Sequence, residues 1–216
     1  MAKILLVRHG ESQANAGVAT VNPRAIPMTE LGHAQAKAFA EKFEHEPTLI
    51  VRSSYIRAME TAAHFIERFP NIPVEDWPVH EFTYLKRGEK LLTGKERLPA
   101  VLEYWAQCDP DHRDGPVTET FSELVERCRN AIARFEALGP DALVVVFTHG
   151  YWMQIFRMCL LFPKASVKEL MANARRFDHA HPIRNTHVLE FESGAGGTRP
   201  IAQELPAAFE LANEPS

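Results

Sequence analysis

The sequence predicts an α/β fold, a three-layer α/β/α sandwich around a mainly parallel central sheet with an antiparallel edge strand. Short apolar runs alternate with longer segments whose apolar residues recur at helical spacing, which is typical of βαβ units. A turn-rich stretch at 193–197 separates two short strand patterns and adds the antiparallel edge. Because open sheets of this kind bind ligands at the carboxyl ends of their strands, polar residues there are the candidates for a site.

The first fifty residues form a βαβ pattern. A short apolar run at residues 3–7 is typical of a strand buried on both faces, and a similar run follows at 49–51. Between them, Thr29 precedes a segment with apolar residues at helical spacing and is placed to cap that helix. Two parallel strands joined by a helix are therefore expected here.

The middle of the chain is less regular. Ser53 and Ser54 precede a second amphipathic helix, which Pro70 stops. Residues 71–100 lack clear periodicity apart from a short strand expected around 79–82. We therefore expect a connection there with a lid-like loop.

The second half returns to the alternation of helix and strand. Thr120 and Glu123 form a capping box at the start of a strongly amphipathic helix, and residues 142–147 are the clearest strand of the sequence. Residues 187–191 and 198–202 are expected to pair as an edge hairpin. Three widely spaced cysteines are expected to be reduced packing residues: Cys108, Cys128 and Cys159.

The composition is that of an ordinary globular chain. Its 216 residues are 45% hydrophobic and 24% charged, which fits a single domain over residues 1–216 with a peripheral tail at about 206–216. The net charge of −4 and the lack of a basic block argue against a nucleic-acid partner. The apolar runs are too short to cross a bilayer and the first residues lead straight into a strand, so we expect a cytoplasmic protein with no membrane partner. The oligomeric state is left open.

Charged and imidazole side chains follow two of the predicted strands. Arg8 and His9 come directly after the first strand, and His149 follows the strand at 142–147. Since these strand ends meet at one edge of a parallel sheet, the three side chains are expected to face one ligand, and Gly10 allows the chain to turn sharply. The alternative for Arg8 and His9 is an exposed turn. The alternative for His149 is a buried histidine whose ring nitrogens are all hydrogen-bonded within the protein.

Arg57 occupies the first turn of the second helix, with Ser54 as the expected N-cap. The helix macrodipole disfavours a cation there by about 0.3 to 1 kcal/mol, so a bound anion is expected to compensate. Free N–H groups and a guanidinium together are suited to phosphate. The alternative is an ion pair with a carboxylate such as Glu60. Glu81, taken alone, resembles an ordinary surface acid.

Two arginines and two histidines at strand and helix ends match phosphoryl chemistry. A neutral imidazole can attack phosphorus, guanidinium groups can stabilise its oxygens, and a carboxylic acid can protonate the leaving group. A different class, metal-dependent enzymes, is suggested by Asp178-His179-Ala180-His181, but no further cluster of matching spacing accompanies it and we interpret it as a polar loop. The sequence lacks the nucleophile elbow, the P-loop and the dinucleotide-binding glycine motif.

An ordered set of motifs resembles the histidine phosphatase superfamily, also called phosphoglycerate mutase-like, in its short-chain branch. Each motif alone is short, but their common order makes the resemblance specific. The motifs are RHGES at 8–12 with Asn15 beyond it, MTELGHAQA at 28–36, SSYIRAMETA at 53–62, Glu81, TFSELVER at 120–127, FTHG at 147–150 and Arg184-Asn185-Thr186.

The resemblance implies a phosphohistidine mechanism with no metal and no organic cofactor. His9 would be the nucleophile, and water would later attack the phosphorylated ring. Arg8, Arg57 and His149 would bind the transferring phosphoryl group, and Asn15 could add a hydrogen bond. The substrate would be a small phosphorylated molecule.

The proton donor and the substrate are less directly indicated. The resemblance implies that Glu81 protonates the leaving group, although His80, Glu89 and Glu96 are close in sequence. The chain also departs from the family pattern, since Ala25 stands where many relatives carry Asp, and a Gly-x-Trp-Glu-Gly-like motif after the acid is missing. Substrate recognition is therefore expected to differ.

The same resemblance separates two activities. Mutases of the superfamily carry Arg-Arg-Ser and Arg-His-Tyr-Gly segments that hold a substrate carboxylate, and residues 83–118 contain neither, so a phosphatase is favoured over a mutase-type phosphotransferase or a phosphate- or phosphoprotein-binding module without turnover. The lid candidates are residues 13–28 and 83–100. Residues there could meet a second anionic group or form a solvated face: Tyr84, Lys86, Arg87, Lys90 and Lys95.

Overall fold

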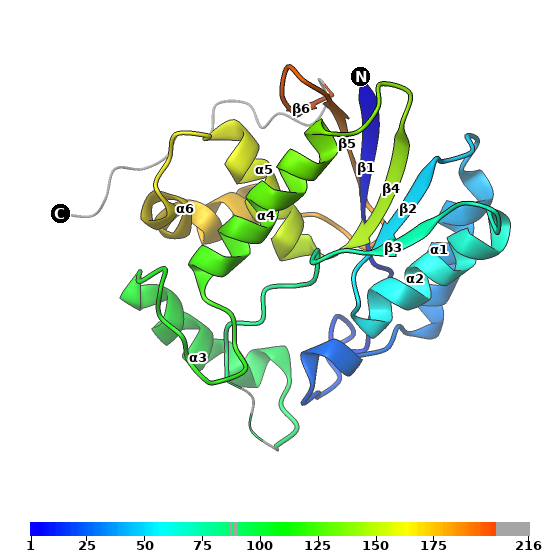
Figure 1. The fold of residues 1–216 in the computed structure, drawn as a ribbon. Helices are drawn as coiled ribbons and strands as arrows, with labels where there is room; N and C mark the ends of the chain where they lie inside the picture. The colour runs from blue at the N-terminus through cyan, green and yellow to red at the C-terminus, as the bar shows by residue number, and fades with distance from the viewer. Residues whose placement is uncertain (87, 89, 202–216) are drawn as a thin grey trace.

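The computed structural model describes residues 1–86, 88 and 90–201, and within them a mixed sheet lies between two layers of helices (Figure 1). The strand order is β3-β2-β4-β1-β5-β6, with the first four parallel and the last two antiparallel to their neighbours. The predicted sandwich with its antiparallel edge is confirmed. The strands are β1 Ala2–Arg8, β2 Leu49–Arg52, β3 Val74–Asp76, β4 Leu143–Thr148, β5 Val188–Ser193 and β6 Arg199–Pro200.

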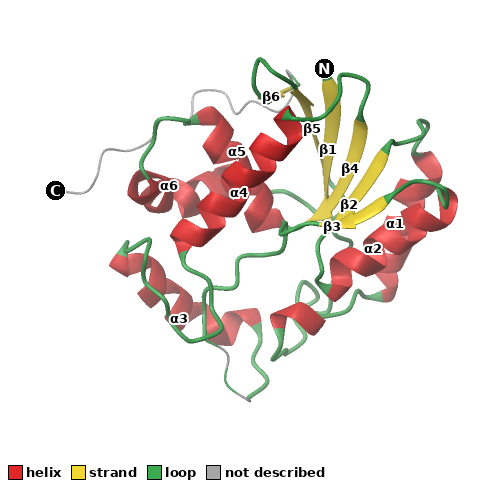
Figure 2. Cartoon of the chain, viewed as in Figure 1, coloured by secondary structure: helices red, strands yellow, loops and turns green. Residues whose placement is uncertain are grey.

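The helices cover both faces of the sheet (Figure 2). On one face lie α1 Glu30–Lys42 and α2 Ile56–Arg68, and on the other lie α4 Phe121–Glu136, α5 Gly150–Leu161 and α6 Val167–Ala180. A further helix, α3 Gly94–Gln107, and a 3-10 turn at Pro23–Ala25 lie below the carboxyl ends of the strands. No helix among the described residues is long and apolar enough to cross a membrane.

Aromatic rings fill the space between the sheet and the α1–α2 layer. Phe39 stacks on Phe65 with ring centroids 5.6 Å apart, and both contact Phe147 of β4. Phe43 and Phe69 complete this cluster at the helix ends. Because each buried aromatic ring contributes about 1.5 to 3 kcal/mol through burial, α1 and α2 are firmly attached to the sheet.

The register of the sheet aligns three strand ends. Arg8 of β1 lies opposite Thr148 of β4, and Phe147 lies opposite Arg52 of β2. The next residues along the three strands, His9, His149 and Ser53, therefore emerge at the same edge, as the sequence predicts for the two histidines.

The middle of the chain differs from the sequence prediction. The strand expected around 79–82 is absent. The strand that this region does contribute to the sheet is β3, at Val74–Asp76, which pairs with the outer side of β2. Residues expected to form a lid-like loop contain α3, which begins with a capping box formed by Thr93 and Glu96. Pro99 inside this helix is the feature that obscured its pattern.

Three smaller expectations are also corrected. Helix α2 begins at Ile56 with Tyr55 as N-cap, not with Ser54. Gly10 does not adopt a positive φ; its missing side chain instead allows a close approach, since a Cβ there would lie 2.5 Å from the carbonyl oxygen of Gly32 in α1. Residues 178–180 belong to α6 rather than to a polar loop.

Other expectations concern the cysteines and the chain end. The three cysteines are free, as predicted, and two of them are buried while Cys108 is half-buried. β5 and β6 form the predicted edge hairpin, of which residue 202 lies outside the described residues. The tail expected at about 206–216 also lies outside the described residues.

Candidate active site

The two histidines predicted to face one ligand lie side by side. Their ring centroids are 5.1 Å apart, and the exposed fraction is 2% for His9 and 0% for His149. The exposed turn considered for Arg8 and His9 is therefore wrong.

Hydrogen bonds set the orientation of the His9 ring. Its Nδ1 lies 2.6 Å from the carbonyl oxygen of Gly10, and because a carbonyl only accepts, Nδ1 carries the proton. The lone pair is then on Nε2, which accepts a hydrogen bond of 3.0 Å from Nε of Arg57. The unprotonated nitrogen thus points at a guanidinium group.

Arg57 is buried to 6% exposure at the start of α2. Besides His9, it donates to the carbonyl oxygen of Pro23 at 2.7 Å. The alternative partner Glu60 accepts from the backbone N–H of Met28 instead, so the predicted interpretation of Arg57 as a site residue is the one the geometry favours. This cation in the first turn of a helix has no carboxylate within hydrogen-bond distance in the described part of the chain.

Electrostatics keep the histidines neutral. Burial lowers the pKa of His9 well below its ordinary value, and the cations of Arg57 and Arg8 lower it further. Burial likewise lowers the pKa of His149 well below its ordinary value, with Arg57 and His9 acting in the same direction. Both rings are uncharged near neutral pH, so the lone pair of His9 is available.

His149 is held in place by a hydrogen bond to Ser53. Its Nε2 lies 2.8 Å from Oγ of Ser53, which also accepts the backbone N–H of Tyr55 at 3.2 Å. The Nδ1 of His149 is buried with no hydrogen-bond partner in the described structure, and so is Nε of Arg8. A satisfied buried histidine, the alternative considered from the sequence, does not describe this ring.

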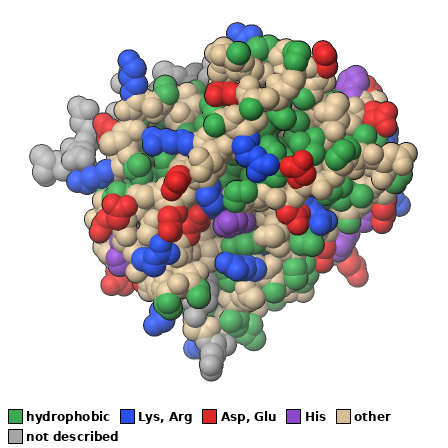
Figure 3. Space-filling view, in the orientation of Figure 1, with side chains coloured by type: hydrophobic (Ala, Val, Ile, Leu, Met, Phe, Trp, Pro, Cys, Tyr) green, Lys and Arg blue, Asp and Glu red, His purple; other side chains and the backbone are tan. Residues whose placement is uncertain are grey.

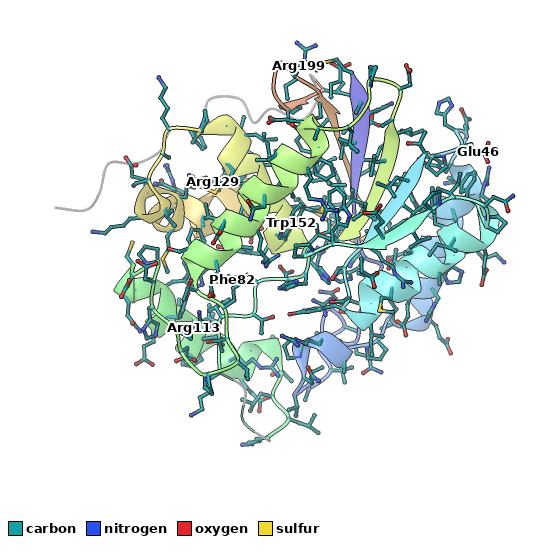
Figure 4. All side chains as sticks on the ribbon, in the orientation of Figure 1. Glu46, Phe82, Arg113, Arg129, Trp152 and Arg199 are labelled. Carbon is teal, nitrogen blue, oxygen red and sulfur yellow. The ribbon has the colours of Figure 1, made fainter. Side chains whose placement is uncertain are left out.

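Glu81 lies at the N-terminus of α5, where its carboxylate contacts the backbone of Phe82 and Trp152. Figure 4 labels these two residues. Its carboxylate accepts N–H groups from both residues, at 3.1 and 3.3 Å, and its negative charge acts on Arg8 and Arg57. The helix has no side-chain cap of its own, so Glu81 supplies one. Glu81 is therefore held beside the two arginines by backbone contacts, and its role in the site stays a prediction.

The other candidate proton donors make different contacts. Glu96 closes the capping box of α3 with Thr93, and His80 stacks on Tyr55 with ring centroids 5.3 Å apart. Glu89 lies outside the described residues.

Asn15 and Asn185 join the first loop to the last segment. Oδ1 of Asn15 accepts from Ser12 and from Nδ2 of Asn185, which also donates to the carbonyl oxygen of His9 at 2.9 Å. Asn15 thus holds the loop that carries the nucleophile candidate, a role that its sequence position did not reveal.

Thr61 is a site residue that sequence reasoning missed. Its hydroxyl accepts the N–H of Gly10 at 3.0 Å and donates to the carbonyl oxygen of Arg57 at 2.7 Å. It connects the two parts of the site, and only its place inside the SSYIRAMETA motif could have indicated it.

The two lid candidates are joined to each other. Thr20 and Leu92 exchange backbone hydrogen bonds of 3.0 and 3.3 Å, and Arg97 donates to the carbonyl oxygen of Thr20. Of the residues considered for a second anion, the backbone N–H of Lys86 donates to Asp114, and Arg87 lies outside the described residues. Among the described residues no group of three or more His, Cys, Asp or Glu side chains is placed to hold a metal ion.

The fold and these residues define the class of the protein. The family model of the histidine phosphatase superfamily (branch 1) matches residues 4–199, and the chain belongs to this family. It is accordingly an enzyme of the histidine phosphatase class.

Individual relatives are distant. The chain is similar to PhoE of Bacillus subtilis (strain 168), named as an uncharacterized phosphatase, with 25% identity over 69% of this chain and 72% of the relative. It is 28% identical to a metal-independent phosphoserine phosphatase of Arabidopsis thaliana over 69% of this chain and 65% of the relative. A solved mycobacterial glucosyl-3-phosphoglycerate phosphatase in complex with VO3 is 25% identical, with a TM-score of 0.66 over 89% of this chain and 91% of that one.

Proposed function

We propose that this protein hydrolyses a small phosphomonoester through a phosphohistidine intermediate, with His9 as the nucleophile. The observation that carries the proposal is the orientation of His9: Nδ1 faces the Gly10 carbonyl, so the neutral ring presents the Nε2 lone pair to the cation of Arg57. A phosphoryl group bound by that cation would meet the lone pair directly.

Two unpartnered donors support an anion at this place. The hydroxyl of Ser53 accepts an N–H from Tyr55, which leaves its own proton free for Nε2 of His149. We assign the tautomer in which Ser53 donates that proton to Nε2, so that the proton of His149 is on the buried Nδ1, which lacks a partner in the described structure, as does Nε of Arg8. Phosphoryl oxygens would accept from both groups and offset the cost of burying them unpaired.

The reaction then proceeds in two displacements. Nε2 of His9 attacks phosphorus, the bond from phosphorus to the ester oxygen breaks, and the carboxyl group of Glu81, which enters this step in its protonated form, delivers its proton to that oxygen and becomes a carboxylate. Water next attacks the phosphohistidine, the bond from Nε2 to phosphorus breaks, and the carboxylate of Glu81 accepts the proton of the water. Inorganic phosphate leaves and the site returns to its initial state. No step in this sequence uses a metal ion.

The experiment is to trap the intermediate. The protein is mixed with a radiolabelled aryl phosphate in the presence of EDTA, quenched without acid, and digested, and the labelled peptide is mapped. We expect an acid-labile label on the peptide that contains His9, together with release of inorganic phosphate. Transfer of the label to an added phosphoglycerate without release of phosphate would favour a mutase, and phosphate binding without label or turnover would favour a binding module.

A further inference from the structure

A groove lies beside the site. Its first part, with a volume of about 320 Å³, has its walls in three connecting segments: residues 21–24, Thr83 and Leu85, and Val117 and Thr118. We call it the leaving-group groove. A second part of about 350 Å³ shares some of these walls and extends to Tyr55 and His80.

The groove adjoins the phosphate end of the site through two of its lining residues, Pro23 and Tyr55. The carbonyl oxygen of Pro23 accepts the hydrogen bond of 2.7 Å from Arg57, and the ring of Tyr55 lies 5.3 Å from that of His149. A substrate whose phosphoryl group reaches Arg57 and His9 therefore places its remaining atoms against these walls.

The walls favour an apolar and flat group. Val21, Pro23, Leu85 and Val117 present carbon atoms, and the stacked rings of Tyr55 and His80 line the second part. Burial lowers the pKa of His80 to about 3, so its ring is uncharged. A volume of about 150 Å³ is enough for a benzene ring, so the first part alone holds a ring. The small side chain of a phosphorylated serine would fill little of it.

The charges along the groove are few in its first part and mixed in its second. Among the described residues, Arg24 lines both parts and is the one charged residue of the first, whereas the second part also contains Arg127 and three carboxylates, those of Glu119, Glu123 and Glu126. Arg127 is already held by Glu119 through two hydrogen bonds. The face seen in Figure 3 likewise carries acidic and basic side chains interspersed, without a patch of one sign.

We infer that the leaving-group groove binds a ring-bearing leaving group against its apolar walls, so that the preferred substrates are phosphomonoesters of ring-containing alcohols. The inference rests on the proposed function only for the position of the phosphoryl group. It adds a substrate class chosen by side chains outside the catalytic set.

Binding of phosphonates tests the groove without requiring turnover. The probes are ethylphosphonate, 3-phosphonopropanoate and 2-phenylethylphosphonate, and their Kd values are measured by calorimetry on the full chain. We expect the ring-bearing probe to bind about tenfold or more tightly than ethylphosphonate, because its ring buries apolar surface. The carboxylate probe, which meets Arg24 but leaves the apolar walls uncovered, should bind less tightly than the ring-bearing probe.

Two variants assign the preference to the groove. Val117→Asp is expected to reduce the ratio of the two Kd values by about fivefold or more, because it puts a charge on an apolar wall. Val117 is 80% exposed, so folding does not depend on it. The matched control is Leu102→Asp, at a 48% exposed position of α3 that does not line the groove, and it should leave the ratio unchanged.

The outcomes separate the two proposals. Equal binding of the ethyl and phenylethyl probes, or tighter binding of the carboxylate probe than of the phenylethyl probe, would overturn the inference. A ring preference that is lost in Val117→Asp, in a protein that hydrolyses no phosphomonoester, would support the groove and reject the proposed hydrolysis. Hydrolysis without ring preference would do the reverse.

Discussion

The two ends of the site are built differently. At the phosphate end, His9, His149 and Arg57 are buried and their positions follow from strand register and the start of α2. At the leaving-group end, the walls come from connecting segments, and residues such as Val117 are exposed. In the proposed function, the residues that carry the chemistry are therefore positioned by the sheet. The residues that would select the substrate lie on connecting segments, which can change without disturbing the sheet.

The largest effect should come from the phosphate end. His9→Ala removes the attacking nitrogen, and we expect turnover of any phosphomonoester to fall by about 10⁴-fold or more. Steady-state hydrolysis of an aryl phosphate measures the loss, and a thermal melt followed by circular dichroism checks that the fold persists. A variant that retains near-normal rates would remove His9 from the role of nucleophile.

The next largest effect tests whether Glu81 protonates the leaving group when its bond to phosphorus breaks. Glu81→Gln should slow hydrolysis of alkyl phosphates by about 10²- to 10⁴-fold, and that of 4-nitrophenyl phosphate far less, because a good leaving group needs little protonation. Rates over a series of leaving groups provide the measurement. Glu96→Gln is the control, since Glu96 belongs to the cap of α3. Equal losses on both kinds of ester would point to another acid.

A somewhat smaller effect is expected for the binding of phosphate. Arg57→Ala should weaken inhibition by inorganic phosphate by about 2 to 5 kcal/mol, because a buried partner of the anion is lost. The inhibition constant measures it. Arg68→Ala, at the exposed end of the same helix, should leave the constant unchanged. Unaltered inhibition in Arg57→Ala would place the phosphate elsewhere.

The smallest effect concerns Thr61, whose hydroxyl connects Gly10 to Arg57. Thr61→Val keeps the shape of the side chain but leaves the N–H of Gly10 unpaired, so we expect a loss of about 1 to 3 kcal/mol in the free energy of unfolding. Urea denaturation measures this change. Thr48→Val, at an exposed hydroxyl, should cost less. If both variants were equally stable, the two halves of the site would not depend on Thr61.

The sequence was sufficient to predict which residues lie together where one of them violates a helix preference or directly follows a buried strand. Arg57 was identified because a cation is unfavourable in the first turn of a helix, and His9 and His149 because each follows a buried strand. The positions of Glu81 and Asn15 depended on the resemblance alone. Their roles as proton donor and phosphate contact stay predictions.

The remaining features depend on contacts between distant parts of the chain. Ser53 supports His149 and Thr61 supports Gly10 through hydrogen bonds that no local pattern encodes. Helix α3 was missed although Thr93 and Glu96 carry the same signature as the capping box that was recognised at Thr120. The interior Pro99 made the segment resemble a loop.

The reciprocal backbone hydrogen bonds between Thr20 and Leu92 hold two separate stretches of sequence together as one structural unit. One stretch supplies Val21 and Pro23 to the groove, and the other is anchored to it through Arg97. A chimera that exchanges only one stretch with a relative would break this backbone pairing. We therefore expect a chimera of this chain to keep the shape of the groove only when both stretches are exchanged together.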